Sequence, residues 1–215
     1  MSRREKILEK IKKIKESSEE YRIGFSSEEG FKCSLVAVSK SILERGEDIS
    51  LLSKWRQEND FAFPAQFKVT DLGTKTWCEK GLFATPDRIL FWVLDHEKKK
   101  IGHVGLFRLS EDAEFIEADN IVRGESSQVK GIMADAMRAL IKWQREYLEI
   151  PRSYLRVFSD NARAIDFYKR LNYAEIQRVP LYSERSTGRT DWKEIVNNPY
   201  APAEKYFVTM QLAPA

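Results

Sequence analysis

The sequence predicts a mixed α/β fold in which helices pack on one central sheet of about seven strands. Short runs of β-branched and aromatic residues alternate along the chain with amphipathic helical runs. A polar turn joins two of the β-type runs into a hairpin, and one strand–helix–strand unit at residues 114–159 brings two parallel strands together. Because 215 residues suit one domain with an extension, we expect a helical extension over residues 1–30 and one α/β domain over residues 31–215.

Composition excludes some classes of protein. The hydrophobic fraction of 42% and the aromatic fraction of 12% can supply a core, whereas a net charge of +3 is too small to predict a nucleic-acid binder. A local basic groove for an anionic ligand is compatible with that charge.

Cysteine and histidine usage predicts neither a disulfide framework nor a metal site. Cys33 and Cys78 lie far apart without a CxxC pattern, and His96 and His103 are too few for a histidine-rich site. The N-terminal stretch lacks the apolar core of a signal peptide, and no run reaches membrane-spanning length. We therefore expect a cytoplasmic protein.

Residues 3–19 predict a helix with a narrow apolar face. A turn-rich patch at residues 26–30 follows and is expected to separate this helix from the body. We expect the apolar face to dock on the body or on a second subunit, with the charged face in solvent; a basic anchor on an anionic surface is the alternative. The apolar face consists of Ile7, Leu8, Ile11 and Ile14.

The other elements follow from hydrophobic spacing and end signals. Thr70 or Asp71 is the expected cap of one helix, and Asp160 or Asn161 is the expected cap of another. The predicted helices are residues 49–59, 70–80, about 130–148 and 161–171. The predicted strands are residues 33–39, 88–95, 101–109, 114–122, 153–159, 173–182 and 205–212, the last two being an antiparallel pair joined by a long polar loop.

The stretch SSQVKGIMADAM, Ser126 to Met137, predicts an anion site between a strand and a helix. A helix start offers free backbone N–H groups and the positive end of the helix dipole. Gly131 lets the backbone approach an oxyanion, Lys130 adds charge, and Gln128 can donate an amide N–H. The glycine patterns of the P-loop and of dinucleotide-binding folds are both missing from the sequence.

Two segments resemble the GNAT acetyltransferase superfamily. Residues Gln128–Met133 resemble the family's Q/R-x-x-G-x-G/A loop, which binds the pyrophosphate of acetyl-CoA. LRVFSDNARAIDFYKRLNY, Leu155 to Tyr173, resembles the family's strand-N-x-x-A-x-x-F-Y segment. Met133 stands where the family has a small residue, and Asn172 stands where it has a glycine. The order of elements also matches, over about 180 residues from Cys33 to Leu212.

The resemblance implies acetyl-CoA as the co-substrate and no metal. In this family the strand at residues 114–122 splays from its parallel neighbour, and the gap admits the pantetheine arm. The residues that match the family's cofactor site are Asn120, Ile121, Val122, Arg123, Gln128, Val129, Lys130, Gly131, Ile132, Met133, Asn161, Ala164 and Tyr168.

The resemblance also implies that a neutral amine attacks the thioester directly. Glu117 or Asp119 is the expected general base, because both alternate onto one face of the strand before the splay. Tyr168 matches the tyrosine that protonates the leaving thiolate in many relatives. Structural roles are the alternatives: the carboxylates can bind loop N–H groups, Tyr168 can pack in the core, and Asn161 can cap a helix.

The acceptor is expected to be a small-molecule amine. The stretches LLSKWRQEN and IEADNIVRGE resemble the branch of amino-sugar nucleotide and ribosomal-protein N-terminal acetyltransferases, which favours a nucleotide amino sugar of surface-polysaccharide biosynthesis. Arg56, Phe61 and Phe63 are the expected substrate-binding residues, since aromatics stack on sugars or bases and arginine meets phosphate. Phe67 lies in the same cluster, whereas the register of Trp55 favours the core.

Other acceptors and one other class of function stay open at this stage. Small antibiotics and polyamines are candidate acceptors too. A protein N-terminus as acceptor predicts a more acidic and open groove than a nucleotide amino sugar does. A degenerate, non-catalytic module that binds CoA or a partner is the other alternative, because Met133 and Asn172 depart from the family pattern. A homodimer is the candidate assembly that the fold class implies.

Overall fold

The computed structural model describes residues 1–196 and 202–213. Its helices alternate with strands as the sequence predicts. The helices and helical turns are α1 (Arg3–Glu16), η1 (Lys40–Glu44), α2 (Gly46–Glu58), η2 (Asp60–Ala62), α3 (Asp71–Trp77), η3 (Cys78–Phe83), α4 (Ile132–Glu146) and α5 (Ala162–Arg170). The strands are β1 (Arg22–Ser26), β2 (Lys32–Ala37), β3 (Ala65–Phe67), β4 (Ile89–Leu94), β5 (Lys100–Phe107), β6 (Phe115–Arg123), β7 (Arg152–Phe158), β8 (Tyr173–Ser186), β9 (Arg189–Glu194) and β10 (Lys205–Leu212).

One mixed sheet joins all the strands of the described residues, in the order β1-β2-β4-β5-β6-β7-β10-β8-β9-β3. The predicted fold class is confirmed, but the sheet has ten strands rather than about seven. The patch at residues 26–30 is the turn of the β1–β2 hairpin, and the loop expected after β8 contains β9. The rest of that predicted loop, at residues 197–201, lies outside the described residues.

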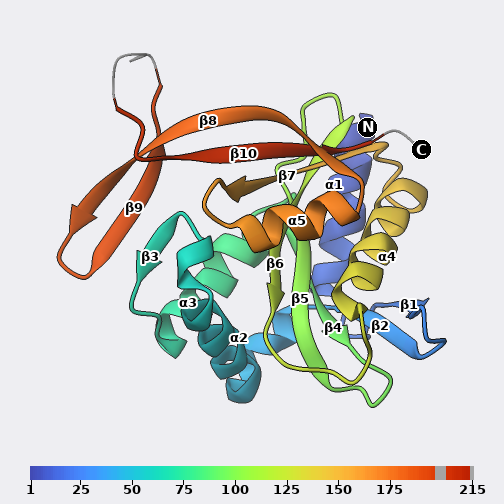
Figure 1. The fold of residues 1–215 in the computed structure, drawn as a ribbon. Helices are drawn as coiled ribbons and strands as arrows, with labels where there is room; N and C mark the ends of the chain where they lie inside the picture. Colours follow the sequence, from blue (N-terminus) through green and yellow to red (C-terminus); the bar gives the residue numbers. More distant parts are fainter. Residues whose placement is uncertain (197–201, 214–215) are drawn as a thin grey trace.

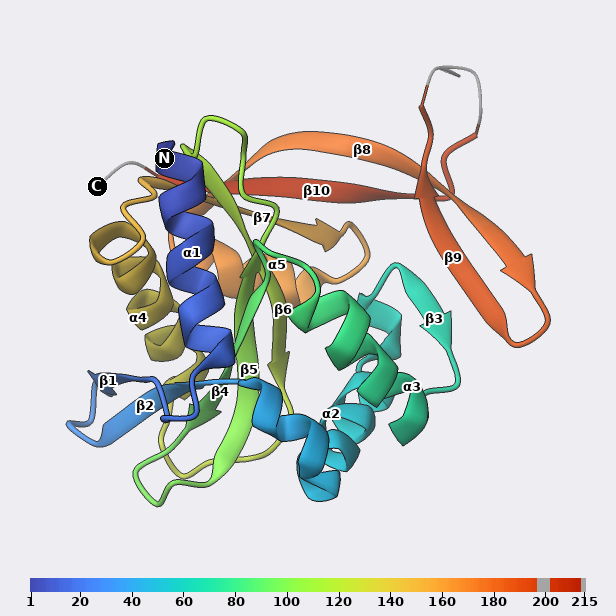
Figure 2. The same ribbon diagram turned by 180° about the vertical axis from the view of Figure 1, so that it is seen from behind.

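The helices cover the sheet from both sides. Figures 1 and 2 place α1 and α4 on one side of β4 and β5, and α2 and α3 on the other. Ile7, Ile11 and Ile14 of α1 are buried in the same core cluster as α4 and the sheet, which confirms that the apolar face docks on the body. The opposite face is covered by a second cluster around Trp55, which is fully buried, as its register predicts.

The sheet opens between its two parallel strands. β6 and β7 pair only at Phe115–Arg152, Ile116–Ser153 and Glu117–Tyr154, and beyond this point they separate. β6 continues to pair with β5, where a register shift between His103 and Gly105 marks a bulge. The predicted splay is therefore present, and it exposes one edge of β6 after Glu117.

The C-terminal strands reach the segment between α2 and α3. β8 and β10 form a long ribbon that extends away from the body, and β9 turns down beside β3 (Figure 1). β3 lies in the segment between α2 and α3, and it pairs antiparallel with β9. This pairing fixes the segment that carries the predicted substrate-binding aromatics.

The docking of α1 leads to a stability prediction. Ile11→Ala should lower the free energy of unfolding by about 2–5 kcal/mol, because Ile11 is fully buried and the substitution leaves a cavity. The measurement is urea denaturation followed by circular dichroism. Lys12→Ala, on the exposed face one residue further, is the control and should change it by less than about 0.5 kcal/mol. Equal effects of the two substitutions would show that α1 does not contribute to the core.

Candidate active site

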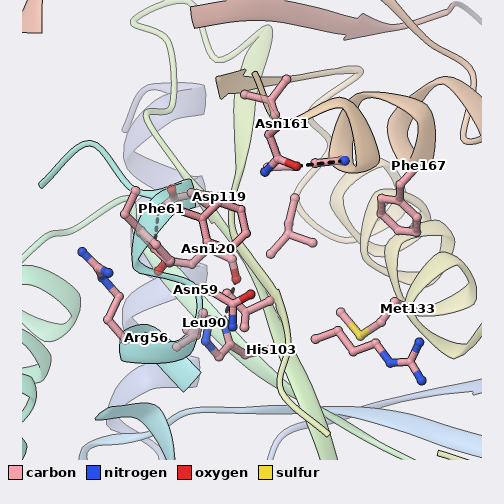
Figure 3. Close-up of a pocket in the computed structure, with 18 of the residues that line it drawn as sticks. Arg56, Asn59, Phe61, Leu90, His103, Asp119, Asn120, Met133, Asn161 and Phe167 are labelled. Carbon is pink, nitrogen blue, oxygen red and sulfur yellow. Dashed lines mark hydrogen bonds between the residues drawn. The ribbon is translucent and has the colours of Figure 1, made fainter. Parts of the chain in front are cut away.

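A single large cavity lies at the splay. Its volume is about 960 Å³, and it runs from the segment between α2 and α3, across β6, to the starts of α4 and α5. In Figure 3, Arg56 and Phe61 lie on one side, Met133 and Phe167 lie on the other, and Asp119 lies between them. The cavity therefore has two ends. We call the one beside Met133 the α4 end, and the one beside the predicted substrate-binding residues Arg56 and Phe61 the acceptor end.

The predicted anion site forms the α4 end. Gly131 precedes α4 with a φ of 71°, a left-handed conformation that favours glycine. The helix ladder begins with the Ala134 and Asp135 N–H groups, which donate to the Gly131 carbonyl at 2.7 and 3.2 Å. The N–H groups before them are therefore left without intrahelical partners. The Lys130 N–H donates to the Glu29 carboxylate at 3.4 Å, which shows that this corner accepts an anionic oxygen.

The bulky residue in this loop, Met133, is mostly buried, although it also lines the cavity. Met133 is buried in the core, and its sulfur packs against β5, 3.2 Å from the position that a Cβ on Gly102 would occupy. Val129 is also buried, whereas the side chain of Gln128 is exposed and is not among the described residues that line the cavity.

The second family-like segment supplies Asn161 and Tyr168. The Asn161 Oδ1 accepts from the Ala164 N–H at 3.1 Å, so the predicted cap is present, and all three residues line the cavity. Tyr168 is buried, and burial raises the pKa of its hydroxyl well above the ordinary value. The phenol is therefore protonated at neutral pH and has a proton to donate.

The two candidate carboxylates have different surroundings. Glu117 is buried and accepts from Arg108 Nη1 at 2.6 Å and from Arg156 Nε at 3.3 Å. Asp119 is less constrained: its Oδ2 accepts from Asn120 Nδ2 at 2.7 Å and lies 3.5 Å from Arg88 Nε. Both of them line the cavity.

A buried histidine supports the bulge beneath the cavity. The Nδ1–H of His103 donates to the Asn120 carbonyl at 2.6 Å, and Asn120 has a φ of 51°. Burial lowers the pKa of His103 to about 4, against smaller opposing effects of the Asn120 carbonyl and Asp119. The imidazole is therefore neutral at pH 7 and holds the backbone where β6 leaves β7.

The predicted substrate-binding residues lie at the acceptor end. Arg56 pairs with Asp60 at 2.6 Å, donates to the Ala65 carbonyl, and stacks 3.9 Å from the centroid of Phe63. The Arg56 guanidinium thus holds the loop between α2 and β3 through its bonds to Asp60 and the Ala65 carbonyl. Phe61 is exposed and lines the cavity.

The structure brings most of the predicted site residues into one cavity. The backbone at residues 120–123, the loop before α4, Asn161, Tyr168 and both carboxylates all line it. Four further residues line the cavity but were not predicted as site residues: Arg88, His103, Arg108 and Arg156. The sequence offers only a weak signal for them, namely a basic residue or a histidine in or next to a predicted strand.

Two parallel strands that separate beside a helix preceded by a glycine are the architecture of a CoA-dependent acyltransferase. The sequence profile of the Acetyltransferase (GNAT) family matches residues 52–173, which is more than half of the chain. The chain therefore belongs to the GNAT family, whose members use acetyl-CoA, and it is an acyl-CoA-dependent N-acyltransferase.

Individual relatives are distant. An N-acetyltransferase 9-like protein of Caenorhabditis briggsae is 22% identical over 142 residues, which cover 61% of this chain and 72% of that protein. A probable GNAT acetyltransferase of Chromobacterium violaceum is 15% identical with a TM-score of 0.64, covering 91% of this chain and 87% of that one. The spermidine N-acetyltransferase SpeG of Vibrio cholerae, in complex with CoA and spermine, is 16% identical with a TM-score of 0.56, covering 84% of this chain and 94% of that one.

Within the described residues, no helix has both the length and the apolar character that crossing a membrane requires.

The neutral buried histidine gives a pH prediction. An unfolded chain binds a proton at His103 near pH 6.5, whereas the folded chain binds it only near pH 4. The contribution of His103 is therefore fully present above pH 6.5 and is lost as the pH falls towards 4, by about 3 kcal/mol in all.

The measurement compares the free energy of unfolding between pH 7 and pH 4.5 in the wild type and in His103→Gln. The variant should lose less stability over this interval, and an NMR titration of the wild type should place the His103 midpoint below 5. A midpoint near 6.5 would contradict the burial of a neutral imidazole.

Proposed function

We propose that this chain transfers the acetyl group of acetyl-CoA to the primary amine of a small molecule. One observation carries the proposal: the splay, the glycine-started helix, Asp119 and Tyr168 all border one cavity. Acetyl-CoA supplies a thioester that the amine attacks and from which a thiolate leaves. The residues of the chain bind the donor, take one proton from the amine and give one to the sulfur.

The donor binds at the α4 end and along β6. Backbone N–H groups of the loop Gln128–Met133 receive the diphosphate, and Lys130 adds a positive charge. The open edge of β6 at Asn120, Ile121, Val122 and Arg123 pairs with the amides of the pantetheine arm, because β7 no longer occupies that side. Asn161 keeps its amide nitrogen for the same arm, and Ala164 packs beside it.

Asp119 is the general base in this proposal. Both oxygens of Glu117 are held by guanidinium groups, which makes it a poor acceptor for a further proton. Asp119 has an oxygen without a hydrogen bond to any described residue, and it lines the cavity. It lies two residues after Glu117, beyond the last pair between β6 and β7. Glu117 then acts by holding Arg108 and Arg156 in place.

The acceptor is a nucleotide amino sugar in this proposal. The acceptor end is aromatic and basic, which supports a stacked, phosphate-bearing acceptor over a protein N-terminus, for which a more acidic groove would be expected. Phe61 is free to stack on such an acceptor, whereas Arg56 is already held by Asp60 and the Ala65 carbonyl. Recognition of the phosphate therefore falls to other arginines.

Gly131→Asp should abolish saturable binding of acetyl-CoA in isothermal titration calorimetry. The substitution places a carboxylate at the anion site and forces a side chain into a left-handed backbone conformation. The wild type should bind one acetyl-CoA per chain.

The matched control is Gly188→Asp, because Gly188 has nearly the same φ of 70° and equally open surroundings in the β8–β9 turn. The control should be strained in the same way but should bind acetyl-CoA normally. Equal binding by both variants would remove the loop from the donor site. A folded wild type that binds no acetyl-CoA would favour the non-catalytic module instead.

Tyr168→Phe and Asp119→Asn should each lower kcat by about 10²-fold or more, since each removes one proton-transfer group. The affinity for acetyl-CoA should change little in Asp119→Asn. Steady-state release of CoA thiol measures kcat, and Tyr147→Phe, on the far end of α4, is the control with unchanged kcat. A kcat within twofold of the wild type in either variant would remove that residue from the chemical step.

A further inference from the structure

We propose that Arg88 and Arg108 form an anion subsite at the acceptor end, which receives a carboxylate or phosphate carried by the acceptor close to its amine. The inference rests on the proposed function and assigns the recognition of charge to two residues that belong to neither the donor site nor the proton-transfer groups. Three observations support it: the stacking of the two guanidinium groups, their incomplete hydrogen bonding, and the balance of charge around them.

Both guanidinium groups stack on one aromatic ring. The Cζ of Arg88 lies 3.6 Å from the centroid of Phe107, and that of Arg108 lies 4.6 Å from it. Arg88 precedes β4 and Phe107 ends β5, and the pairing of Ile89 with Leu106 keeps these strand ends together. Stacking orients a guanidinium and leaves its N–H edge for planar recognition of a carboxylate or phosphate.

The hydrogen-bond capacity of Arg88 is only partly used. Its Nη1 donates to the Gly81 carbonyl at 2.9 Å, but its buried Nε–H has no hydrogen-bond partner among the described residues, since Asp119 lies 3.5 Å away. The Arg88 side chain is only 17% exposed, so water is a poor substitute for the missing hydrogen-bond partner of its Nε–H. Arg108 uses Nη1 for Glu117 and is 46% exposed, and its side chain has no other hydrogen bond to a described residue.

The local charge balance favours an anion over a second cation. Three arginines, Arg88, Arg108 and Arg156, line this end of the cavity together with two carboxylates, Glu117 and Asp119. The lining arginines thus exceed the lining carboxylates by one. Because Arg156 also pairs with Glu194 at 2.7 Å, Arg88 and Arg108 are the two arginines considered for the ligand.

Two other nearby carboxylates, Asp87 and Asp60, do not line the cavity. Asp87 is turned to the Leu109 N–H at 3.0 Å, and Asp60 is held by Arg56. Every carboxylate that lines this end is thus already next to an arginine. A polyamine would find only the Asp119 carboxylate, which already lies beside Arg88, whereas an anionic acceptor would find unused N–H donors.

The position of Asp119 restricts the acceptor further. Asp119 is the proposed base and lies beside Arg88, so the amine and the anion must be close together in the acceptor. Amino acids and phosphorylated amino sugars meet this requirement, and the two sources share the chemistry that the subsite recognises.

The first experiment uses simple anions. The protein is saturated with CoA, so that anions cannot enter the donor site, and is titrated with inorganic phosphate and with acetate while the Nε–H resonances of arginine are followed by NMR. Saturable shifts of the Arg88 resonance at millimolar anion are expected. Binding should weaken at least fivefold in Arg108→Met, followed at the Arg88 resonance. It should weaken equally in Arg88→Lys, which keeps the charge but loses the planar fork and is followed at the Arg108 resonance.

Arg178→Met, at an exposed arginine that pairs only with Glu175 among the described residues, is the control and should bind like the wild type. Phosphate or acetate that leaves the Arg88 resonance unmoved, or that binds equally to all variants, would overturn the subsite. The titration can also be run without CoA, so it reports on the subsite even if the protein binds no acetyl-CoA. Failure of acetyl-CoA binding would count against the proposed function alone.

The second experiment uses matched acceptor pairs that differ by the anion. Release of CoA is measured for glucosamine against glucosamine 6-phosphate, and for putrescine against 4-aminobutyrate. The anionic member should have a kcat/KM at least tenfold higher in one pair, which identifies phosphate or carboxylate as the natural source, and Arg108→Met should remove the preference. Faster acetylation of putrescine or spermidine than of every anionic amine would overturn the inference.

Discussion

The buried carboxylate of Glu117 joins three strands at the point where the sheet opens. Glu117 is the last residue of β6 that pairs with β7, and it is bound by Arg108 from the end of β5 and by Arg156 from β7. A buried charge is stable only when it is paired, and removal of one partner of such a pair costs about 3–5 kcal/mol. The network therefore fixes the register of β5, β6 and β7 at the branch.

The geometry of the cavity depends on this branch point. Below it the strands pair and the core is continuous; above it β6 follows β5 alone. The bulge at His103 and the left-handed Asn120 turn the free edge of β6 towards the gap, and the neutral imidazole supports the Asn120 carbonyl there. Because the carboxylate network and the bulge lie on one short segment, donor site, base and acceptor end all meet within a few residues of β6.

The predictable parts of the site are the local ones. The caps at Thr70 and Asn161, the left-handed Gly131 and the buried register of Trp55 depend on neighbours in the sequence, and the structure has all of them. The arginine network depends on Glu117, which binds Arg108 9 positions before it and Arg156 39 positions after it, and no local pattern reveals this convergence.

The predicted number of strands was too low for a similar reason. β3 has three residues and exists only because β9, far along the chain, pairs with it, and β1 is a short edge strand with alternating burial. Such strands are defined by their partners rather than by their own β propensity. The loop Gln128–Met133 can be predicted from the sequence as the start of a helix, because a glycine before an amphipathic run is a local signal. The acceptor end is built from side chains that converge from separate strands.

The same distinction separates the two halves of the reaction. In the proposed reaction, the donor half uses backbone N–H groups and an open strand edge, which depend little on side chains such as the mostly buried Met133. The proposed acceptor half uses the side chains of Arg88, Arg108 and Asp119, together with the loop that follows α2 and pairs with β9. Backbone geometry is shared by chains that are 15% identical, but side chains at strand ends are not constrained by the fold. A structural neighbour named for spermidine can therefore share the fold while this chain lines its cavity with arginines.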